Sequence, residues 1–531
     1  MKSKVFFFVC ILLLHADLDA QHVFQISSLT RQGSGMVDMK KSFDEGIISL
    51  GYSYSGSADS SHIQLEKFDS NYVSQWVKSY SVISDTLMPG NFIETDAGDI
   101  IVSGQLITGG TSDINLFKTD QSGNLLWSRQ IDHYNDDKPM SLATTGDGSI
   151  YIASIGYSLP TSKVISLIKC DSLGNSIWSK SISGGNNDIP SKMILSADTH
   201  LVIAGTSNSF SSGTSFFLSK FDSSGNYLWY KTYFTGLSDT CHSLIRTNDG
   251  GYLMVGSGGT DGNDVLIIKT DSTGMLQSSY SYNLGFGSNG NIDRGMHLIN
   301  TADGGYAIAG ETEANGSGLP FYFLLKLSSN FVIEWHNTFG FQSYNLLGAI
   351  LQMKDNGYLL CGLRKAFSST TNKNILVKTD HLGQTACLQT IVDLTTGIEN
   401  PFSASAGPSV LNTITSESNL LLVNINSSIS RDTICYLITA IDETINNSLP
   451  DIYPNPFSDK LFLKLENNSF GHSFEIRIFE LSGRLIFYNS IIQSDQIQNL
   501  INTVRLEDGM YLLNIYENRQ LIKSVKIFCQ H

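Results

Sequence analysis

The sequence predicts an all-β protein, a seven-bladed β-propeller followed by a small antiparallel β-sandwich domain. A unit of about 50 residues recurs seven times, and each unit contains four short segments rich in Val, Ile, Tyr and Phe, separated by Gly, Asn and Asp. No segment shows sustained helical periodicity. The 47 glycines and the charged fraction of only 16% fit a folded, turn-rich chain.

The first marker of the repeat is a lysine that precedes a turn motif by two residues. In most units an Asp follows, as in the turn Asp120-Gln-Ser-Gly123-Asn124, where Asp accepts backbone hydrogen bonds and Gly supplies a positive φ. The steps between successive lysines are 51, 51, 51, 49, 57 and 52 residues. The seven lysines are Lys67, Lys118, Lys169, Lys220, Lys269, Lys326 and Lys378.

Two further markers keep the same register. Seven residues after the turn Asp, or the Ser that replaces it, come Trp76, Trp127, Trp178, Trp229, Ser278, Trp335 and Cys387, and these five tryptophans are all that the chain contains. A second aspartate, followed by a Gly-rich turn and an apolar strand, recurs as Asp44, Asp96, Asp147, Asp198, Asp249, Asp303 and Asp355. Both markers count seven units.

Each unit is expected to form four strands, exemplified by residues 243–246, 252–255 and 265–269, with an outer strand such as 227–232 around the tryptophan. Four strands in about 50 residues, repeated seven times, are typical of a β-propeller. A single flat sheet of this size would expose edges that a ring protects.

The ring is expected to close through the N-terminal segment. Phe24 stands ten residues before Ser34, the same distance that separates Trp178 from Asp188 in a complete unit. Residues 21–29 therefore resemble an outer strand without a blade of its own. We predict that this strand completes the seventh blade beside residues 367–380.

The pattern Lys-x-Asp-x-x-Gly-Asn-x-x-Trp resembles the turn-plus-tryptophan motif of quinoprotein-like propellers, and the resemblance covers roughly residues 30–390. In that family the tryptophan packs between neighbouring blades. The resemblance implies the same packing role here, and no quinone site is expected.

The N-terminus has the order of a secretory signal. Lys2 and Lys4 precede the apolar run 5–14, and a more polar stretch ends at Ala20. We assign residues 1–20 to a signal peptide and residues 21–390 to the propeller. No later segment reaches the apolar length of a membrane helix, and a net charge of −15 argues against nucleic acid as a partner.

Residues 391–447 lose the repeat and are rich in Ser, Thr and Asn, which predicts a linker region with some extended structure or an incomplete extra sheet. Residues 448–531 contain the start 452–457 (Ile-Tyr-Pro-Asn-Pro-Phe), a Leu-Ser-Gly-Arg hairpin at 481–484 and an Asp-Gly-Met-Tyr turn at 508–511. These motifs resemble the type A sorting domain of the Bacteroidetes type IX secretion system. The resemblance implies a small β-sandwich, contact with the type IX secretion machinery, and a final location that is secreted or attached to the outer cell surface.

One polar row could bind a cation. Ser34, Asp85, Asp137, Asp188, Asp239, Asp293 and Asn345 begin successive units, so five carboxylates are expected near one rim of the channel. Such oxygen ligands suit calcium. The alternative is that each Asp caps a local turn. No other cofactor is predicted.

The cysteines and histidines offer no further site. Cys170, Cys241 and Cys361 occupy apolar or small repeat positions and are expected to be buried free thiols, whereas Cys387 and Cys435 bracket the irregular region and could form a disulfide after export. The histidines show no ligand spacing.

The sequence thus favours a non-enzymatic binding or adhesion propeller for a protein or glycan. A secreted hydrolase or lyase acting on polysaccharide, and a structural component of the cell envelope, stay open as alternatives. Convergent carboxylates, His and Tyr at one channel mouth would favour the enzyme, and a loop face with exposed aromatics would favour binding.

Overall fold

A computed structural model of the chain shows an all-β protein with two compact units, one spanning Phe24–Tyr436 and one containing Leu437–His531. The signal peptide, residues 1–20, lies outside the described part of the chain. The structure describes residues 22–29, 35–54, 61–82, 85–134, 136–159, 162–236, 238–259, 264–284, 292–313, 321–339, 344–365, 372–385, 389–390, 395–398, 402–405, 409–413, 416–419, 423–426, 430–438, 451–453, 460–464, 473–480, 485–492, 499–502, 509–517 and 520–529.

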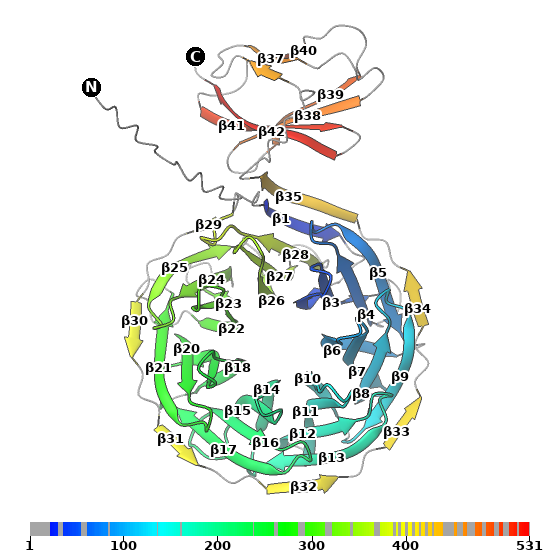
Figure 1. Cartoon of the computed structure of the whole chain (residues 1–531), viewed down its shortest axis with the longest axis vertical. Coiled ribbons are helices and arrows are strands. Elements are labelled where there is room, and N and C mark those ends of the chain that lie inside the picture. Colours follow the sequence, from blue (N-terminus) through cyan, green and yellow to red (C-terminus); the bar gives the residue numbers. More distant parts are fainter. Residues whose placement is uncertain are drawn as a thin grey trace, which may run out of the picture. The chain divides into compact units, whose positions relative to one another are not determined.

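The first unit is a ring of seven antiparallel sheets, the blades, each built from four successive strands around a common axis (Figure 1). Blades 1 to 4 follow chain order. They are β2 (Gly35–Lys41), β3 (Ile47–Tyr54), β4 (Ser61–Phe68), β5 (Ser74–Ser81); β6 (Thr86–Glu94), β7 (Ile100–Thr108), β8 (Thr111–Thr119), β9 (Leu125–Asp132); β10 (Lys138–Thr144), β11 (Ile150–Leu159), β12 (Ser162–Cys170), β13 (Ser176–Ser183); and β14 (Asp188–Leu195), β15 (Leu201–Ser207), β16 (Ser215–Phe221), β17 (Tyr227–Phe234).

Blades 5 to 7 continue the ring, and the last one takes its fourth strand from the N-terminus. They are β18 (Thr240–Arg246), β19 (Tyr252–Gly258), β20 (Asp264–Thr270), β21 (Leu276–Asn283); β22 (Asp293–Asn300), β23 (Tyr306–Thr312), β24 (Phe321–Leu327), β25 (Ile333–Phe339); and β26 (Tyr344–Gln352), β27 (Tyr358–Lys365), β28 (Asn372–Lys378) with β1 (His22–Leu29). The β-propeller prediction is confirmed.

In six of the seven blades the lysine marker forms an ion pair with an aspartate of the same blade. The lysine at the end of the third strand reaches the turn before the second strand, for example from Lys326 Nζ to Asp303 Oδ2 at 2.8 Å. In blade 2 the partner is Asp99, 2.7 Å from Lys118, so the assignment of Asp96 to this row was wrong. The other pairs are Lys67–Asp44, Lys220–Asp198, Lys269–Asp249 and Lys378–Asp355.

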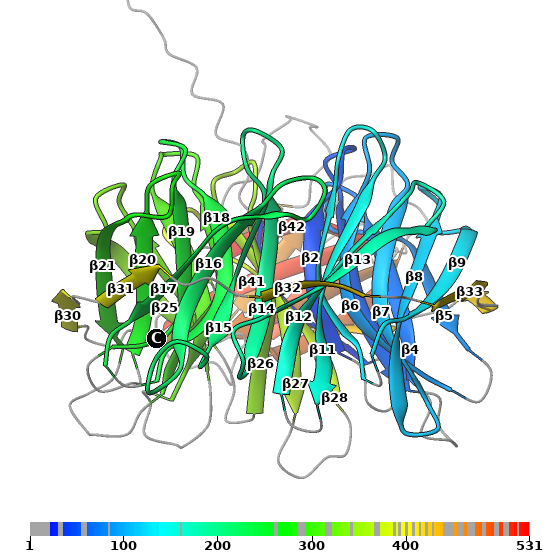
Figure 2. The ribbon, with the colours of Figure 1, turned by 90° about the horizontal axis from the view of Figure 1, so that it is seen from below.

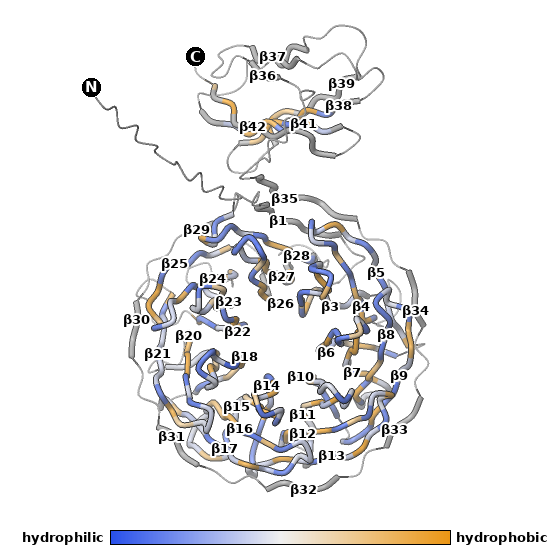
Figure 3. Tube along the Cα trace, in the orientation of Figure 1, coloured by the Kyte–Doolittle hydropathy of each residue, from blue (hydrophilic) through white to orange (hydrophobic). Residues whose placement is uncertain are grey.

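The hydrophobic core is divided into clusters that neighbouring blades share. One cluster joins Leu253 and Val255 of blade 5 to Ile308 and Phe323 of blade 6, and the same arrangement recurs around the ring. Figure 3 shows hydrophobic and hydrophilic positions interleaved along the blade strands. Each blade therefore depends on its two neighbours for the burial of its apolar faces.

The tryptophans pack between blades, as predicted. Each indole lies against the turn glycine of the next blade, and a Cβ added to that glycine would lie within 3.0 Å of an indole carbon. The pairs are Trp76–Gly123, Trp127–Gly174, Trp178–Gly225, Trp229–Gly274 and Trp335–Gly383. Two constraints favour glycine at this position. Its φ is positive, and no side chain fits beneath the indole.

The predicted closure of the ring is confirmed. Strand β1 pairs antiparallel with β28, and the register places Phe24 opposite Lys378 and Ser28 opposite Asn374. The first described strand of the chain therefore completes the last blade. The pairing of β1 with β28 is not a local hairpin, because the two strands lie at opposite ends of the repeat array.

Residues 391–447 do not form an incomplete extra sheet. Their strands run around the outside of the ring, and each adds a fifth strand to one blade (Figure 1; Figure 2 shows several of them between the two faces). The order is the reverse of chain order, from blade 6 back to blade 1 and then to blade 7. We call this segment the belt: β29 (Gln389–Thr390), β30 (Thr395–Ile398), β31 (Phe402–Ser405), β32 (Ser409–Thr413), β33 (Ser416–Asn419), β34 (Val423–Asn426) and β35 (Ser430–Ile438).

The second unit contains two antiparallel sheets. A three-stranded sheet has the order β36 (Asp451–Tyr453), β37 (Lys460–Lys464), β40 (Asn499–Asn502), and a four-stranded sheet has the order β39 (Leu485–Ile492), β38 (Ser473–Glu480), β41 (Gly509–Glu517), β42 (Gln520–Cys529). Strands β38 and β39 pair on either side of the predicted hairpin at 481–484. Ile476, Ile478, Leu513 and Ile515 are fully buried and form its described core.

The predicted thiols are confirmed as buried and free at Cys170, Cys241 and Cys361. Cys387 and the side chain of Cys435 lie outside the described residues, so the disulfide stays a prediction. None of the described residues belongs to a helix with the length and hydropathy that crossing a bilayer requires.

Deleting residues 21–30 from the mature chain removes β1, which pairs with β28 and adjoins β35. We expect the Tm of the propeller transition in calorimetry to fall by about 10 °C or more. Blade 7 loses its fourth strand, so that β28 and the belt strand β35 both lose their pairing partner. Truncation after residue 447 is the control, since it removes only the second compact unit, and it should leave this transition in place. An unchanged Tm in the deletion variant would contradict closure by β1.

Gly225→Ala should destabilise more than Gly250→Ala. Both glycines have positive φ (72° and 83°), so both variants carry a backbone penalty of about 1–2 kcal/mol. Only at Gly225 does the new Cβ meet an indole, that of Trp178, whereas nothing lies within 4 Å at Gly250. The steric clash should add about 1–3 kcal/mol, measured by urea unfolding. Equal losses would show that the indole contact does not constrain the turn.

Candidate functional site

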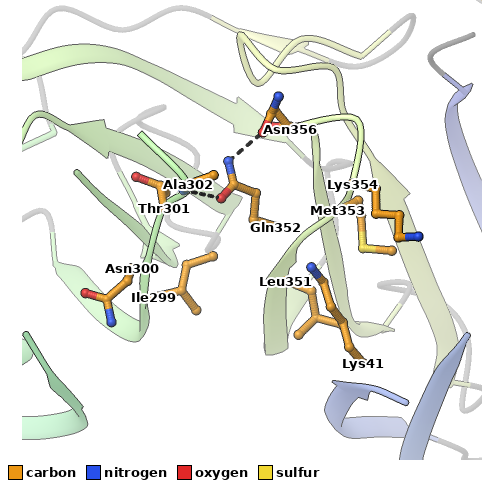
Figure 4. Close-up of a pocket in the computed structure, with 10 residues that line it drawn as sticks. All are labelled: Lys41, Ile299, Asn300, Thr301, Ala302, Leu351, Gln352, Met353, Lys354 and Asn356. Carbon is orange, nitrogen blue, oxygen red and sulfur yellow. Dashed lines mark hydrogen bonds between the residues drawn. The ribbon is translucent and has the colours of Figure 1, made fainter. Parts of the chain in front are cut away.

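A pocket of about 510 Å³ opens at one mouth of the ring axis, between blades 6 and 7. Two turns that follow inner strands form most of it, and Lys41 of blade 1 completes it (Figure 4). Gln352 joins the two blades, because its Oε1 accepts the N–H of Ala302 at 2.8 Å and its Nε2 donates to the carbonyl of Asn356 at 3.4 Å. We call it the mouth pocket; its lining residues are Lys41, Ile299, Asn300, Thr301, Ala302, Leu351, Gln352, Met353, Lys354 and Asn356.

Amides and ammonium groups dominate the lining of the mouth pocket. None of the described residues that line it carries a carboxylate, an imidazole or a thiol. Lys354 forms an ion pair with Glu45 of blade 1. Burial lowers the pKa of Lys41, against the opposing influence of Asp355. The pocket can therefore donate and accept hydrogen bonds, but its described lining lacks the paired groups of general acid–base catalysis.

Deeper along the axis, every inner strand contains a β-bulge at the same place. The register shifts between Met36 and Asp38, and the corresponding shift occurs in each other blade. A bulge adds one residue and re-aims the side chain that follows it. The residues directly after the shifts are Asp38, Asn91, Ser141, Lys192, Ser243, His297 and Ala349.

Polar groups at or next to these bulges contact one another within a blade and between neighbouring blades. Asn91 Nδ2 donates to Asp38 Oδ2 at 3.1 Å, and Lys40 lies 3.7 Å from the same carboxylate. Burial lowers the pKa of Lys40 to about 8, with a smaller opposing effect of Asp38. Burial also lowers the pKa of His242 and of His297 to about 4, so both imidazoles are neutral at neutral pH. Sequence spacing missed this group, although the shared bulge position in the repeat would have revealed it.

The predicted acidic row lies at the start of the inner strands. Asp137, Asp188, Asp239 and Asp293 are almost completely buried, and Asp85 is half-buried. Each buried carboxylate accepts a backbone N–H from the loop that enters its blade, at 2.9 Å from His133, 2.7 Å from Gly184, 2.8 Å from Thr235 and 2.7 Å from Leu284, respectively. Ser34 and the side chain of Asn345 lie outside the described residues. The capping role is therefore present, and cation binding by the row as a whole stays a prediction.

Asp137 differs from the two neighbours that follow it. The second oxygen of Asp188 accepts from the Tyr230 hydroxyl at 3.3 Å, and that of Asp239 accepts from the Thr235 hydroxyl at 2.6 Å. Asp137 Oδ1 is buried and has no hydrogen-bond partner among the described residues. An unpaired buried carboxylate oxygen is costly unless a proton or a cation compensates it.

Two more carboxylates lie beside Asp137. Asp113 of β8, Asp132 at the end of β9 and Asp137 each place one oxygen within 4.8 Å of the others. The pKa of Asp137 is raised to about 7, chiefly by burial and to a smaller extent by the charges of Asp113 and Asp132, while backbone hydrogen bonds from Tyr134 and His133 oppose the increase. Oxygens on opposite sides of a calcium ion are about 5 Å apart, so these three residues could hold Ca²⁺. Asp113 and Asp132 belong to no repeat row, which is why sequence reasoning missed them.

Calcium should raise the Tm of the wild-type protein and should not raise that of Asp137→Asn. At a free calcium concentration 100 times the Kd, the expected stabilisation is about 2.7 kcal/mol. Asp188→Asn is the matched control, because this variant weakens a loop cap and leaves the three-carboxylate cluster intact. Differential scanning calorimetry in calcium and in chelator measures the effect. A wild-type Tm that does not respond to calcium would remove the cation site.

Comparison with known protein families identifies residues 451–530 as a secretion system C-terminal sorting domain. This domain marks proteins that the type IX secretion system exports to the cell surface or beyond, so the chain is an exported protein whose tail engages that machinery. The match covers the second compact unit and confirms the resemblance of the C-terminal motifs. The comparison with curated proteins found no match.

Solved structures with a similar course of the chain include an N11 neuraminidase-like protein of influenza A/flat-faced bat/Peru/033/2010 (13% identity, 69% of this chain, 95% of that chain, TM-score 0.35). Core factor of S. cerevisiae is 10% identical over 68% of this chain and 62% of that chain, with a TM-score of 0.35. A glycosyl hydrolase from Bacteroides ovatus is 10% identical over 58% of this chain and 87% of that chain, with a TM-score of 0.26. At these identities and TM-scores the likeness says nothing about activity.

Proposed function

We propose that the mature protein is a non-enzymatic binding or adhesion module, displayed on or released from the cell surface, whose propeller binds a protein or a glycan. Export through residues 448–531 delivers it to that location. The ligand binds on one face of the ring. On this face, turns join the first strand of each blade to the second and the third strand to the fourth. The mouth pocket lies on this face.

The lining of the mouth pocket carries this proposal. Its described residues offer two lysines, three side-chain amides and a threonine hydroxyl, which suit the polar edge of a glycan or of a peptide. A hydrolase or lyase needs convergent acid and base groups near the bound ligand, and the described lining supplies none. The neutral histidines near the axis come from inner strands and do not belong to this lining.

Lys41→Ala should weaken ligand binding by about tenfold, since a hydrogen bond to a charged group contributes about 1.5–3 kcal/mol. The mature wild-type protein is first screened on a glycan array and, with purified surface proteins, by biolayer interferometry, and the variant is then measured against each ligand found. Lys138→Ala is the matched control, because Lys138 is an exposed lysine at the opposite end of an inner strand. Equal effects of the two substitutions would rule out the mouth pocket as the site.

Chromatography of each bound glycan after prolonged incubation tests the non-enzymatic part of the proposal. The glycan should be recovered intact. Release of shorter products by wild-type protein would contradict the proposal and favour the hydrolase or lyase.

A further inference from the structure

Two of the seven blade junctions lack the tryptophan–glycine contact in both partners: blade 7 to blade 1, with Phe24 and Tyr72, and blade 5 to blade 6. The second of these carries a pocket. Blade 5 has Ser278 where blade 4 has Trp229, and the turn of blade 6 has Phe331 where the turn of blade 5 has Gly274. Phe331 keeps the left-handed backbone of the glycine it replaces, with a φ of 63°. That conformation is unfavourable for a phenylalanine, so the surrounding packing must stabilise it.

Phe331 packs between aromatic rings of the two blades. Its ring stacks on Tyr306 of blade 6 with centroids 5.2 Å apart and on Tyr280 of blade 5 with centroids 5.1 Å apart. Its carbonyl accepts the Tyr282 hydroxyl at 2.8 Å, the same bond that Tyr233 makes to Gly274. The three stacked rings therefore hold the turn in place without a tryptophan.

A pocket of about 590 Å³ lies beside these rings, between blades 5 and 6. Ser278 and the aromatic rings form its inner wall, and exposed polar side chains form its rim. We call it the junction pocket; its lining residues are Asn248, Asp249, Lys269, Gln277, Ser278, Tyr280, Gly304, Tyr306, Ser329, Asn330 and Phe331.

The chemistry of the lining suits a sugar ring. A pyranose has an apolar face of C–H groups that packs on aromatic rings, and a periphery of hydroxyl groups that bind amides. Asn248, Gln277 and Asn330 supply exposed amides at the rim. The two charged groups neutralise each other, because Lys269 forms an ion pair with Asp249 and also donates to Gln277 Oε1 at 2.8 Å. A neutral sugar therefore fits better than a uronic or sialic acid.

The junction pocket and the mouth pocket share one hairpin of blade 6. Residues 300–302 line the mouth pocket, and Gly304 and Tyr306 line the junction pocket. The two pockets thus adjoin on the same face of the ring. A chain of several sugars can occupy the mouth pocket with one unit and the junction pocket with another.

We propose that the junction pocket is a binding subsite for a neutral pyranose unit of an oligosaccharide. This inference rests on the proposed binding function and names its ligand class. The subsite lies at a junction where Ser278 and Phe331 replace the tryptophan and glycine found at five other junctions.

Ser278→Trp combined with Phe331→Gly tests the subsite, because the double variant rebuilds the junction found in the other blades. The mature protein and the variant are titrated calorimetrically with malto-, cello-, xylo-, manno- and chitohexaose. We expect at least one hexasaccharide to bind wild-type protein and to bind the double variant at least tenfold more weakly, while the Tm stays equal or rises.

Asn330→Ala and Asn248→Ala provide a second arm that does not touch the core. Each should weaken the same hexasaccharide about threefold to tenfold, whereas Asn226→Ala in the blade 4 turn, beside an intact tryptophan junction, should not. The subsite is overturned if no hexasaccharide binds wild-type protein, or if the double variant and the two asparagine variants bind as wild type does. Binding that survives these changes but is lost in Lys41→Ala would leave the proposed function standing and remove only the subsite.

Discussion

A blade of this ring cannot bury its two faces alone, so its stability depends on the fit of its neighbours. The Trp–Gly contact controls that fit at five junctions, because the indole of one blade fills the space that a Cβ would need in the next. A change on one side of a junction therefore requires a change on the other. Ser278 and Phe331 show this coupling, since a smaller residue in blade 5 coincides with a larger one in blade 6.

The outer edges of the blades present a second constraint. A fourth strand with unpaired backbone N–H and C=O groups can pair with a strand of another chain. The ring has seven such outer strands, one in each blade. The belt covers them one after another with short strands, and β1 and β35 bring both ends of the propeller unit to blade 7. Most belt strands are only two to five residues long, and such short edge strands are poor templates for further pairing.

The two ends of the inner strands have different roles. At the start of these strands, buried carboxylates hold the loops between blades, and in Asp188 and Asp239 both oxygens are used for that purpose. Asp137 keeps one oxygen without a hydrogen-bond partner among the described residues and has two carboxylate neighbours, and these features are the basis of the predicted cation site. At the other end, the turns form two adjoining pockets with amides, lysines and aromatic rings. One face therefore carries the buried loop caps, and the other carries the pockets to which we assign the proposed ligand binding.

The sequence by itself determined the number of blades, the order of their strands, the packing role of the tryptophans and the closure by residues 21–29. These features follow from a local pattern of turns and strands that recurs in register, so each copy supports the others. Only the tertiary structure decided the course of the belt, because six of its seven strands have only two to five residues, and such short strands carry no local signal of their distant partners. The same holds for the Asp113, Asp132 and Asp137 cluster, for His297, which senses the charges of Asp38 and Lys192, and for the junction pocket. Each joins residues that are distant in sequence, and only the packing of neighbouring blades sets the distances between their side chains.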